Sequence, residues 1–198
     1  MMPRVYTAVV GDYAKRTDIE CFTGDDIFTR PVMEAKRYKI LPHLFFRDDI
    51  TIWVDCNIWL TQSPTLVADA LLGTADMAVF SHPYRKTVWE EFLTLRDDPR
   101  FAIPYLQQQL KRQAADYGWL SDDAPLYECS ILIRRNSPKV RRAMEAWWAQ
   151  ICRYQWRDQV SLPYVLATHD IKVNAIQGNA RNHPLFRHVE QWPTATSA

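Results

Sequence analysis

Short apolar runs alternate along the chain with longer segments whose apolar residues recur at helical spacing. Residues 50–54 are almost entirely apolar, which predicts a strand buried on both faces of a sheet. Pro31 suits the first turn of a helix and Pro42 stops one, so a helix is expected between them. The same reasoning predicts strands at 5–10, 19–23, 50–54, 77–80, 127–134 and 171–175, and helices at 31–41, 66–72, 88–96, 103–117, 139–154 and 159–168.

The regular alternation of strands and helices is typical of an α/β layer fold. The sequence contains no internal repeat, low-complexity tract or linker. Its 198 residues suffice for one ordinary domain with a sizeable core. We therefore expect residues 1–192 to form a single domain and residues 193–198, PTATSA, to form a frayed tail.

Charge and composition narrow the class of partner. The 24 basic and 23 acidic residues give a net charge of +1, which argues against nucleic acid and against a polybasic membrane anchor. The aromatic share of 13% suits a sugar or nucleotide ligand, and a Trp-rich core would explain it equally well. The chain shows no signal peptide, no run long enough to span a bilayer and no C-x-x-C pair, so we expect a cytoplasmic protein with reduced thiols.

The end of the apolar strand at 50–54 carries the strongest candidate chemistry. Asp55 and Asn57 follow it directly, and ligands of open α/β sheets bind at the carboxyl ends of strands. Two oxygen-bearing side chains at i and i+2 point the same way in an extended chain, so both can reach one divalent cation or one ribose hydroxyl. The alternative is a turn in which both side chains cap backbone groups.

Other strand ends and the first helix add polar residues to the same edge. Gly11-Asp12 follows the first predicted strand and Asp25-Asp26 follows the second, although turn chemistry alone also produces such pairs. Lys36 and Lys39 are three residues apart and share a helix face, so together they could meet a diphosphate. A solvated basic face is the competing explanation for the two lysines.

Three further residues or motifs are candidates for contact with a substrate. His82 and Arg85 lie in a loop after a strand and suit phosphate or hydroxyl recognition, or an ordinary surface loop. Glu128 interrupts an apolar strand, where a buried carboxylate without a partner would be costly. Asp158 begins a helix, where it could serve simply as the N-cap. The sequence has no P-loop, G-x-G-x-x-G turn, G-x-S-x-G elbow, H-E-x-x-H or paired zinc-type cysteines.

Six ordered blocks of the chain resemble a glycosyltransferase-like domain family found in bacteria and in plant proteins linked to cell-wall and mucilage polysaccharides. These blocks are VYTAVVGDY, ECFTGDD, AKRYKILPH, ITIWVDCNIWL, FSHPYR with EE, and RDQVSLPYVL, and the resemblance covers about residues 4 to 175. The resemblance implies a GT-A-like (Rossmann-like) α/β domain with a central mixed, mostly parallel sheet flanked by helices. It also implies transfer of a sugar from a nucleotide donor, with a UDP-sugar favoured, to a saccharide or glycan acceptor.

The resemblance assigns roles to individual residues. Asp55 and Asn57 match the D-x-D motif that holds a divalent metal, Mn²⁺ or Mg²⁺, and the donor diphosphate; Asn57 replaces the second carboxylate, which puts the metal dependence in question. His183 and His188 are both available as a third metal ligand. Asp158 and Glu128 are the candidate catalytic residues. The residues expected to bind the donor are Thr7, Ala8, Gly11, Tyr13, Phe22, Thr23, Asp25, Lys36, Lys39, His82, Arg85 and Gln159.

Several alternatives stay open at this stage. The residues do not choose between inversion and retention at the anomeric carbon: an inverting enzyme needs a carboxylate base near the acceptor hydroxyl, whereas a retaining one need not have it. Strand-end carboxylates and basic residues would also suit a metal-dependent phosphoesterase or nuclease. A non-catalytic protein that binds sugar nucleotides is the third possibility, suggested by Asn57. A homo-oligomer is also possible.

Overall fold

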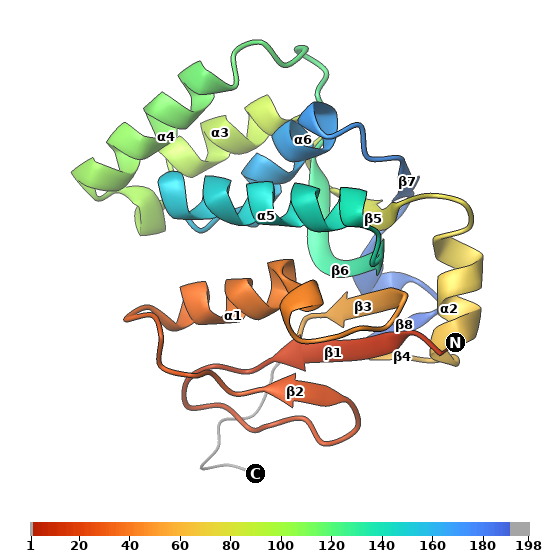
Figure 1. The fold of residues 1–198 in the computed structure, drawn as a ribbon. Helices are drawn as coiled ribbons and strands as arrows, with labels where there is room; N and C mark the ends of the chain where they lie inside the picture. The colour runs from red at the N-terminus through yellow and green to blue at the C-terminus, as the bar shows by residue number, and fades with distance from the viewer. Residues whose placement is uncertain (1, 191–198) are drawn as a thin grey trace.

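The computed structural model describes residues 2–190, and these form one mixed sheet flanked by helices (Figure 1). The predicted tail at 193–198 lies outside the described residues. The sheet has six strands in the order β2-β1-β3-β6-β5-β7, and only β6 runs antiparallel to its neighbours. The strands are β1 (Arg4–Ala8), β2 (Glu20–Phe22), β3 (Ile50–Val54), β5 (Met77–Ser81), β6 (Tyr127–Arg135) and β7 (Val173–Ile176). The mixed, mostly parallel α/β fold predicted from the sequence is therefore confirmed.

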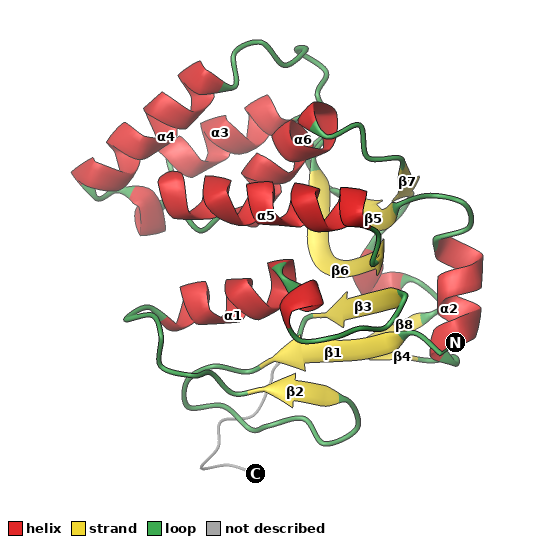
Figure 2. Ribbon diagram, in the orientation of Figure 1, coloured by secondary structure: helices red, strands yellow, loops and turns green. Residues whose placement is uncertain are grey.

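Helices cover both faces of the sheet because each face is apolar (Figure 2). One face packs against α1 (Pro31–Ile40), α5 (Pro138–Arg153) and α6 (Asp158–Thr168) around the fully buried Trp147. The other face packs against α2 (Pro64–Leu71). The helices α3 (Val88–Arg96) and α4 (Pro104–Asp116) build a third apolar cluster with Tyr117 and Tyr154. No helix within residues 2–190 has the length and apolar character needed to cross a membrane.

The parallel strands end at one common edge of the sheet. Strands β2, β1 and β3 are parallel neighbours, so the turns that follow them, at Gly24-Asp25, Gly11-Asp12 and Asp55, leave the sheet at the same edge. Strand β6 begins at this edge, where Glu128 pairs with Phe80 near the end of β5. A bulge between Val79 and Phe80 shifts the register there, so the end of β5 and the start of β6 are irregular. This geometry brings Asp55, Glu128 and the turns after β1 and β2 to a single edge of the sheet.

A second, two-stranded sheet was not predicted. Its strands are β4 (Ile58–Leu60) and β8 (Phe186–His188), and they pair antiparallel so that Ile58 faces His188. Strand β4 follows the turn at Asp55, in which the Ile58 amide donates to the Asp55 carbonyl over 2.9 Å. The apolar run that starts at residue 50 therefore contains two strands separated by a turn. Because of the turn, the i and i+2 rule for extended chains does not apply to Asp55 and Asn57.

Candidate functional site

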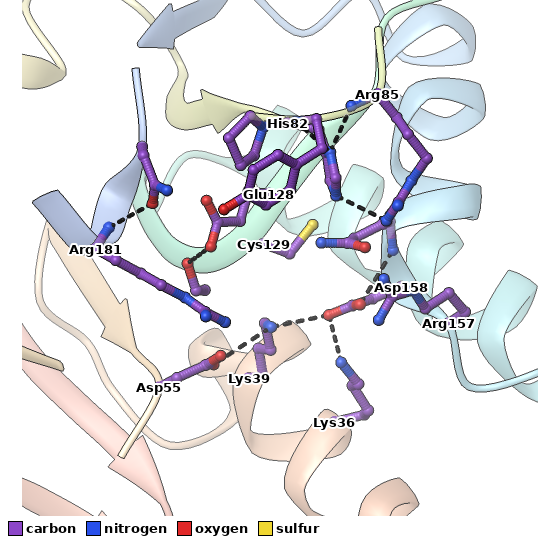
Figure 3. A pocket seen from close by; sticks show the side chains of 15 residues that line it. Lys36, Lys39, Asp55, His82, Arg85, Glu128, Cys129, Arg157, Asp158 and Arg181 are labelled. Carbon is purple, nitrogen blue, oxygen red and sulfur yellow. Dashed lines mark hydrogen bonds and ion pairs between the residues drawn. The ribbon is translucent and has the colours of Figure 1, made fainter. Parts of the chain in front are cut away.

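A cavity of about 320 Å³ opens at the edge where β3 and β5 end and β6 begins (Figure 3). Its walls come from α1, the turn after β3, the loop after β5, the start of β6 and the start of α6. Both signs of charge are present, so the cavity is suited to a polar ligand rather than an apolar one. Its charged lining residues are Lys36, Lys39, Asp55, Arg85, Glu128, Arg157, Asp158 and Arg181.

Asp158 lies at the centre of this cavity and binds both lysines of α1. Its Oδ2 atom lies 2.5 Å from Lys36 Nζ and 2.9 Å from Lys39 Nζ. The two lysines reach one carboxylate because residues three apart lie on the same helix face. Lys39 also lies 3.6 Å from Asp55 Oδ1, which links the carboxylate of α6 to the end of β3. The sequence indicated each of these residues but not that they form one network.

Burial and charge shift the pKa values of this network in defined directions. Burial on its own would raise the pKa of Asp158, but the ammonium groups of Lys36 and Lys39 outweigh it and lower the pKa well below its usual range. Burial would lower the pKa of Lys39, yet Asp158 and Asp55 outweigh it and raise the pKa. For Lys36 burial dominates over the attraction of Asp158 and lowers the pKa. Asp158 is therefore a permanent anion at neutral pH.

Two explanations that the sequence left open are wrong: Asp158 is not a simple helix cap, and Lys36 and Lys39 do not form a solvated basic face. Asp158 is the first residue of α6 and Arg157 is its N-cap, with no side-chain capping hydrogen bond, so Asp158 is not the helix cap. Lys39 and Asp158 are almost completely buried, and Lys36 retains 17% of its side-chain exposure, so the lysines do not form a solvated basic face. A carboxylate between two buried lysines is stabilised by charge rather than by the helix terminus.

Asp55 is fixed at the rim of the cavity by its neighbours. Trp53 Nε1 donates to Asp55 Oδ1 over 2.9 Å, and the Asp55 amide donates to the Ser130 carbonyl over 2.8 Å. Its side chain keeps 43% exposure, so part of the carboxylate faces solvent. The turn that the sequence left as an alternative does exist at the backbone, but the Asp55 carboxylate binds Lys39 and Trp53 rather than capping the turn.

The short β4–β8 sheet brings Asn57 and His188 together. The Asn57 side-chain nitrogen lies 3.1 Å from His188 Nε2, and the Val189 amide donates to the Asn57 carbonyl over 3.0 Å. His183 lies elsewhere: its ring packs between Phe80 and Phe186, and burial lowers its pKa. Spacing alone could not choose between the two histidines. The structure places only His188 beside the D-x-N turn.

Asp55, Asn57 and His188 offer a set of donors that fits a divalent cation. Carboxylate and amide oxygens are ordinary ligands of Mn²⁺ and Mg²⁺, whereas an imidazole suits the transition metal Mn²⁺ better than Mg²⁺. Rotation of the Asn57 amide exchanges its nitrogen for its oxygen. Within residues 2–190 no three His, Cys, Asp or Glu residues gather as a metal site, so such a site depends on the amide of Asn57. The proposed set therefore has fewer charged ligands than a D-x-D pair with a histidine.

Glu128 and Gln159 present polar atoms that the described residues leave without a partner. Glu128 Oε1 accepts a hydrogen bond of 3.0 Å from Ser130 Oγ, while Oε2 is buried and without a hydrogen bond. Gln159 Oε1 is also buried and without a hydrogen bond. Both residues line the cavity and are at least nine-tenths buried. Because unsatisfied buried oxygens are costly, these two atoms are candidates to contact a ligand or water.

A buried glutamate that the sequence did not single out holds two arginines at the cavity wall. Glu91 on α3 is fully buried, and its Oε1 accepts a hydrogen bond of 2.7 Å from Arg157 Nε. Arg85 Nε forms an ion pair of 2.5 Å with Glu91 Oε2. His82 Nε2 lies 3.0 Å from Arg85 Nη2, and burial together with Arg85 lowers the pKa of His82 to about 4. His82 is therefore neutral at physiological pH.

A second cavity, also about 320 Å³, adjoins the first and shares Lys36, Lys39 and Asp55 with it. Ala8 at the end of β1 lines this second cavity, as do Val32 and Ala35 of α1. Among the residues predicted to contact the nucleoside, Ala8 is the one that lines it.

The other predicted nucleoside contacts lie away from both cavities. Thr7 is fully buried, and the ring of Phe22 stacks on Tyr38 with centroids 4.2 Å apart, so both side chains belong to the interior. Gly11, Tyr13 and Thr23 are exposed on the turns after β1 and β2. Asp25 is exposed and pairs with Arg37 over 3.1 Å. The turns lie at the predicted edge, but these side chains do not line the cavities that the described residues form.

The mixed six-stranded sheet flanked by helices is a fold of the GT-A glycosyltransferase type. The chain belongs to the TOD1/MUCI70 glycosyltransferase-like domain family, whose sequence model matches residues 23–189. A search of curated proteins found no match.

Several solved glycosyltransferase structures are similar to this chain at low sequence identity. A glycosyltransferase involved in glycosylation of the major capsid of PBCV-1 superposes with a TM-score of 0.52 at 9% identity, and the alignment covers 98% of this chain and 97% of that one. The bifunctional glycosyltransferase WbbM has a TM-score of 0.49 at 11% identity over 89% of this chain. Mouse xyloside xylosyltransferase 1 has a TM-score of 0.45 at 12% identity, covering 90% of this chain and 68% of its own. This chain spans only 36% of the WbbM chain.

Proposed function

We propose that the protein transfers a sugar from a nucleotide donor, with a UDP-sugar favoured, to a saccharide acceptor. The observation that carries this proposal is the buried network of Asp55, Lys39, Asp158 and Lys36, which joins a strand-end carboxylate to two cations inside the cavity. Such a network can hold a diphosphate on one side and a sugar on the other. Membership in a glycosyltransferase-like family supports the same reading.

Charge on the leaving group is the main demand of this reaction. As the anomeric carbon–phosphate bond breaks, negative charge grows on the diphosphate, and groups aimed at that charge stabilise the transition state. Lys36 and Lys39 supply positive charge where the two cavities meet. Asp55, Asn57 and His188 would hold a divalent metal, which when bound supplies additional positive charge to the diphosphate.

Asp158 and Glu128 take different roles in this proposal. Asp158 is anchored by two lysines and its pKa is strongly lowered, so it positions the lysines and orients the donor sugar rather than accepting a proton. Glu128 has one buried oxygen free of hydrogen bonds, and that oxygen accepts the proton of the acceptor hydroxyl if the reaction inverts the anomeric centre. The catalytic assignment therefore moves from Asp158 toward Glu128.

A sugar-nucleotide-binding protein without catalysis is the second candidate, and Asn57 is the observation that favours it. An amide is a weaker metal ligand than a carboxylate, so Asn57 would lower the affinity for the ion. Hydrolysis of the donor in the absence of an acceptor separates the two candidates, since a purely binding protein leaves the donor intact. The phosphoesterase alternative finds no support in the family to which the chain belongs.

The proposal is tested by thermal melting of the protein with UDP, GDP, CDP and ADP sugars, each with and without Mn²⁺. At a ligand concentration of about 100 times the dissociation constant, binding adds about 2.7 kcal/mol to the free energy of unfolding. We expect UDP-sugars to give the largest increase in melting temperature and Mn²⁺ to enlarge it. An unchanged melting temperature with every donor, with and without metal, contradicts the proposal.

A further inference from the structure

The Arg85–Glu91–Arg157 cluster provides an anion-binding site that the transfer chemistry described above does not use. Both guanidinium groups engage Glu91 through their Nε nitrogens. No described residue accepts a hydrogen bond from the terminal nitrogens of Arg157. Two positive charges surround one buried negative charge, so the cluster carries a net positive charge at the cavity wall. Fully buried Glu91 holds both arginines in fixed positions, which prepares them to bind a ligand.

The cluster lies apart from the proposed diphosphate site. Lys39 and Asp158 lie between Asp55 and Arg157 (Figure 3). Lys39 Nζ is 3.6 Å from Asp55 Oδ1 and 2.9 Å from Asp158 Oδ2. Arg85 comes from the loop after β5, further along the same wall (Figure 3). With the donor sugar at Asp158, as the proposed function has it, the arginines line the side of the cavity away from Asp55, where an acceptor would have room.

Tyr84 supplies the second observation, because it points to a sugar rather than to a free inorganic anion. It is next to Arg85, lines the cavity and keeps 80% of its surface exposed. An exposed aromatic ring at a rim offers an apolar face beside a polar hydroxyl, which suits the mixed surface of a sugar ring. Glu128 Oε2 and Gln159 Oε1, both buried and without partners, line the same cavity and can bind sugar hydroxyls.

We propose that Arg85 and Arg157 bind the carboxylate of an acidic acceptor saccharide, so that the protein glycosylates a uronate-containing glycan. The inference rests on the proposed function for its reaction and adds the class of acceptor. The two terminal nitrogens of Arg157 match a planar carboxylate because they can form two parallel hydrogen bonds with it. Arg85 uses Nε toward Glu91 and Nη2 toward His82, so it contributes positive charge and its remaining Nη1 donor. Glu91 is a positioning residue in this arrangement: it holds both arginines and does not touch the saccharide.

The test uses short oligouronates as probes, with the same oligosaccharides reduced at their carboxyl groups as neutral partners. Binding is measured by isothermal titration calorimetry with UDP present, and transfer is measured with the donor selected by the melting screen. We expect the oligouronate to bind at least about tenfold more tightly than its reduced form, the scale of a charge-assisted hydrogen bond. Equal affinity for the two forms overturns the inference.

Variants of the arginines identify the site. Arg157→Met is expected to weaken oligouronate binding by about tenfold or more and to leave the affinity for the reduced oligosaccharide close to that of the wild type. Arg157→Lys keeps the charge but loses the paired nitrogens, so it recovers part of the affinity. Arg85→Met tests the same site from a different loop if Arg157→Met does not fold. Arg96→Gln, at an exposed arginine paired with Asp97, is the matched control.

Two outcomes separate this inference from the proposed function. If Arg157→Met lowers the affinity for UDP as much as that for the oligouronate, the arginines hold the diphosphate and the inference is wrong. If a nucleotide sugar carrying a uronic acid gains affinity through the arginines while acidic acceptors do not, the carboxylate belongs to the donor and the acceptor assignment is wrong. Failure of every nucleotide sugar to bind contradicts the proposed function instead, whatever the oligouronates do.

Discussion

Asp158 combines features that do not usually occur together: it is 3% exposed, charged and shared by two lysines. A charge buried in this way is tolerated only while its partners remain, because removing one partner leaves the others without compensation. The two lysines come from α1 and the carboxylate from α6, so the network also ties together two helices that are far apart in the sequence. The stability of the fold and the proposed binding of the substrate therefore depend on the same side chain.

Asp158→Asn is expected to destabilise the protein by about 3–5 kcal/mol, because two buried ammonium groups lose their shared counterion. It should also reduce kcat, since the lysines lose the group that positions them. Chemical unfolding and steady-state transfer measure the two effects. The pKa of Asp158 in the folded protein lies below its ordinary value of 3.8. The Asp158 carboxylate therefore stabilises the wild type fully above pH 3.8, and this stabilisation is lost progressively as the pH falls below 3.8.

Acid titration of both proteins checks the assignment. Between pH of about 5 and about 2 the wild type should lose more stability than Asp158→Asn, because the variant has no such carboxylate to protonate.

Glu128→Gln is the contrasting variant: it removes the candidate base without breaking an ion pair, so it should lower kcat by about 10²-fold and leave the melting temperature nearly unchanged. Full activity in Glu128→Gln would return the role of the base to Asp158.

At the scale of elements, β4 and β8 decide which histidine is near the D-x-N turn. Their pairing places Ile58 opposite His188, which brings His188 to Asn57 and leaves His183 among aromatic rings. The pairing depends on three-residue strands that join positions about 130 residues apart in the chain. A candidate metal ligand is thus selected by a small piece of sheet.

His188→Ala is expected to weaken Mn²⁺-dependent stabilisation by UDP, because one of the three candidate donors is removed. His183→Ala is the matched control and should leave the metal response intact, since that ring packs on Phe80 and Phe186. Asn57→Asp should strengthen the response, because a carboxylate binds Mn²⁺ or Mg²⁺ more tightly than an amide. Melting curves at a series of Mn²⁺ concentrations measure all three, and an identical response in His188→Ala and His183→Ala would remove His188 from the site.

The sequence predicted the six strands of the large sheet and the six α-helices, including the three-residue strand β2, but it did not predict the second sheet. Strand β3 and helix α3 have the predicted ends because a long apolar run or a Thr87 cap marks them. The strands β4 and β8 have only three residues each, so no alternation can develop within them. Glu91 is fully buried while Glu90 beside it is exposed, and no local pattern distinguishes them. Contacts between segments far apart in the chain determine which glutamate is buried, and they likewise determine that His188 rather than His183 lies beside the D-x-N turn.

At the scale of the whole molecule, charge is distributed unevenly. The sequence has a net charge of only +1, yet the main cavity is lined by five lysines and arginines and three carboxylates. Positive charge concentrated in a cleft with low-dielectric walls raises the local concentration of anions. The net charge of the chain argued against nucleic acid as a partner, but it did not reveal this local excess of positive charge.

The affinity for UDP is therefore expected to fall as salt is added. The screening length shortens from about 10 Å at 0.1 M to about 3 Å at 1 M ionic strength, which weakens attraction between the cavity and the diphosphate. Uridine carries no phosphate and is the matched control, since its affinity should change little. Calorimetric titrations over this range of ionic strength measure the affinity for both ligands. If the affinities for UDP and uridine change equally with salt, the diphosphate does not interact with the cationic lining of the cavity.

The pairing of β8 with β4 has a consequence for the order in which the protein is made. Translation runs from Lys36 to His188, so the lysines, the D-x-N turn and Asp158 leave the ribosome before the final candidate ligand exists. All strands of the large sheet are complete once residue 176 has emerged, while the small sheet still waits for residues 186–188. A nascent chain arrested between these points can assemble the main core and still lack His188. The proposed metal site would then become complete only near the end of synthesis, together with Phe186, the last residue of the apolar cluster beneath α2.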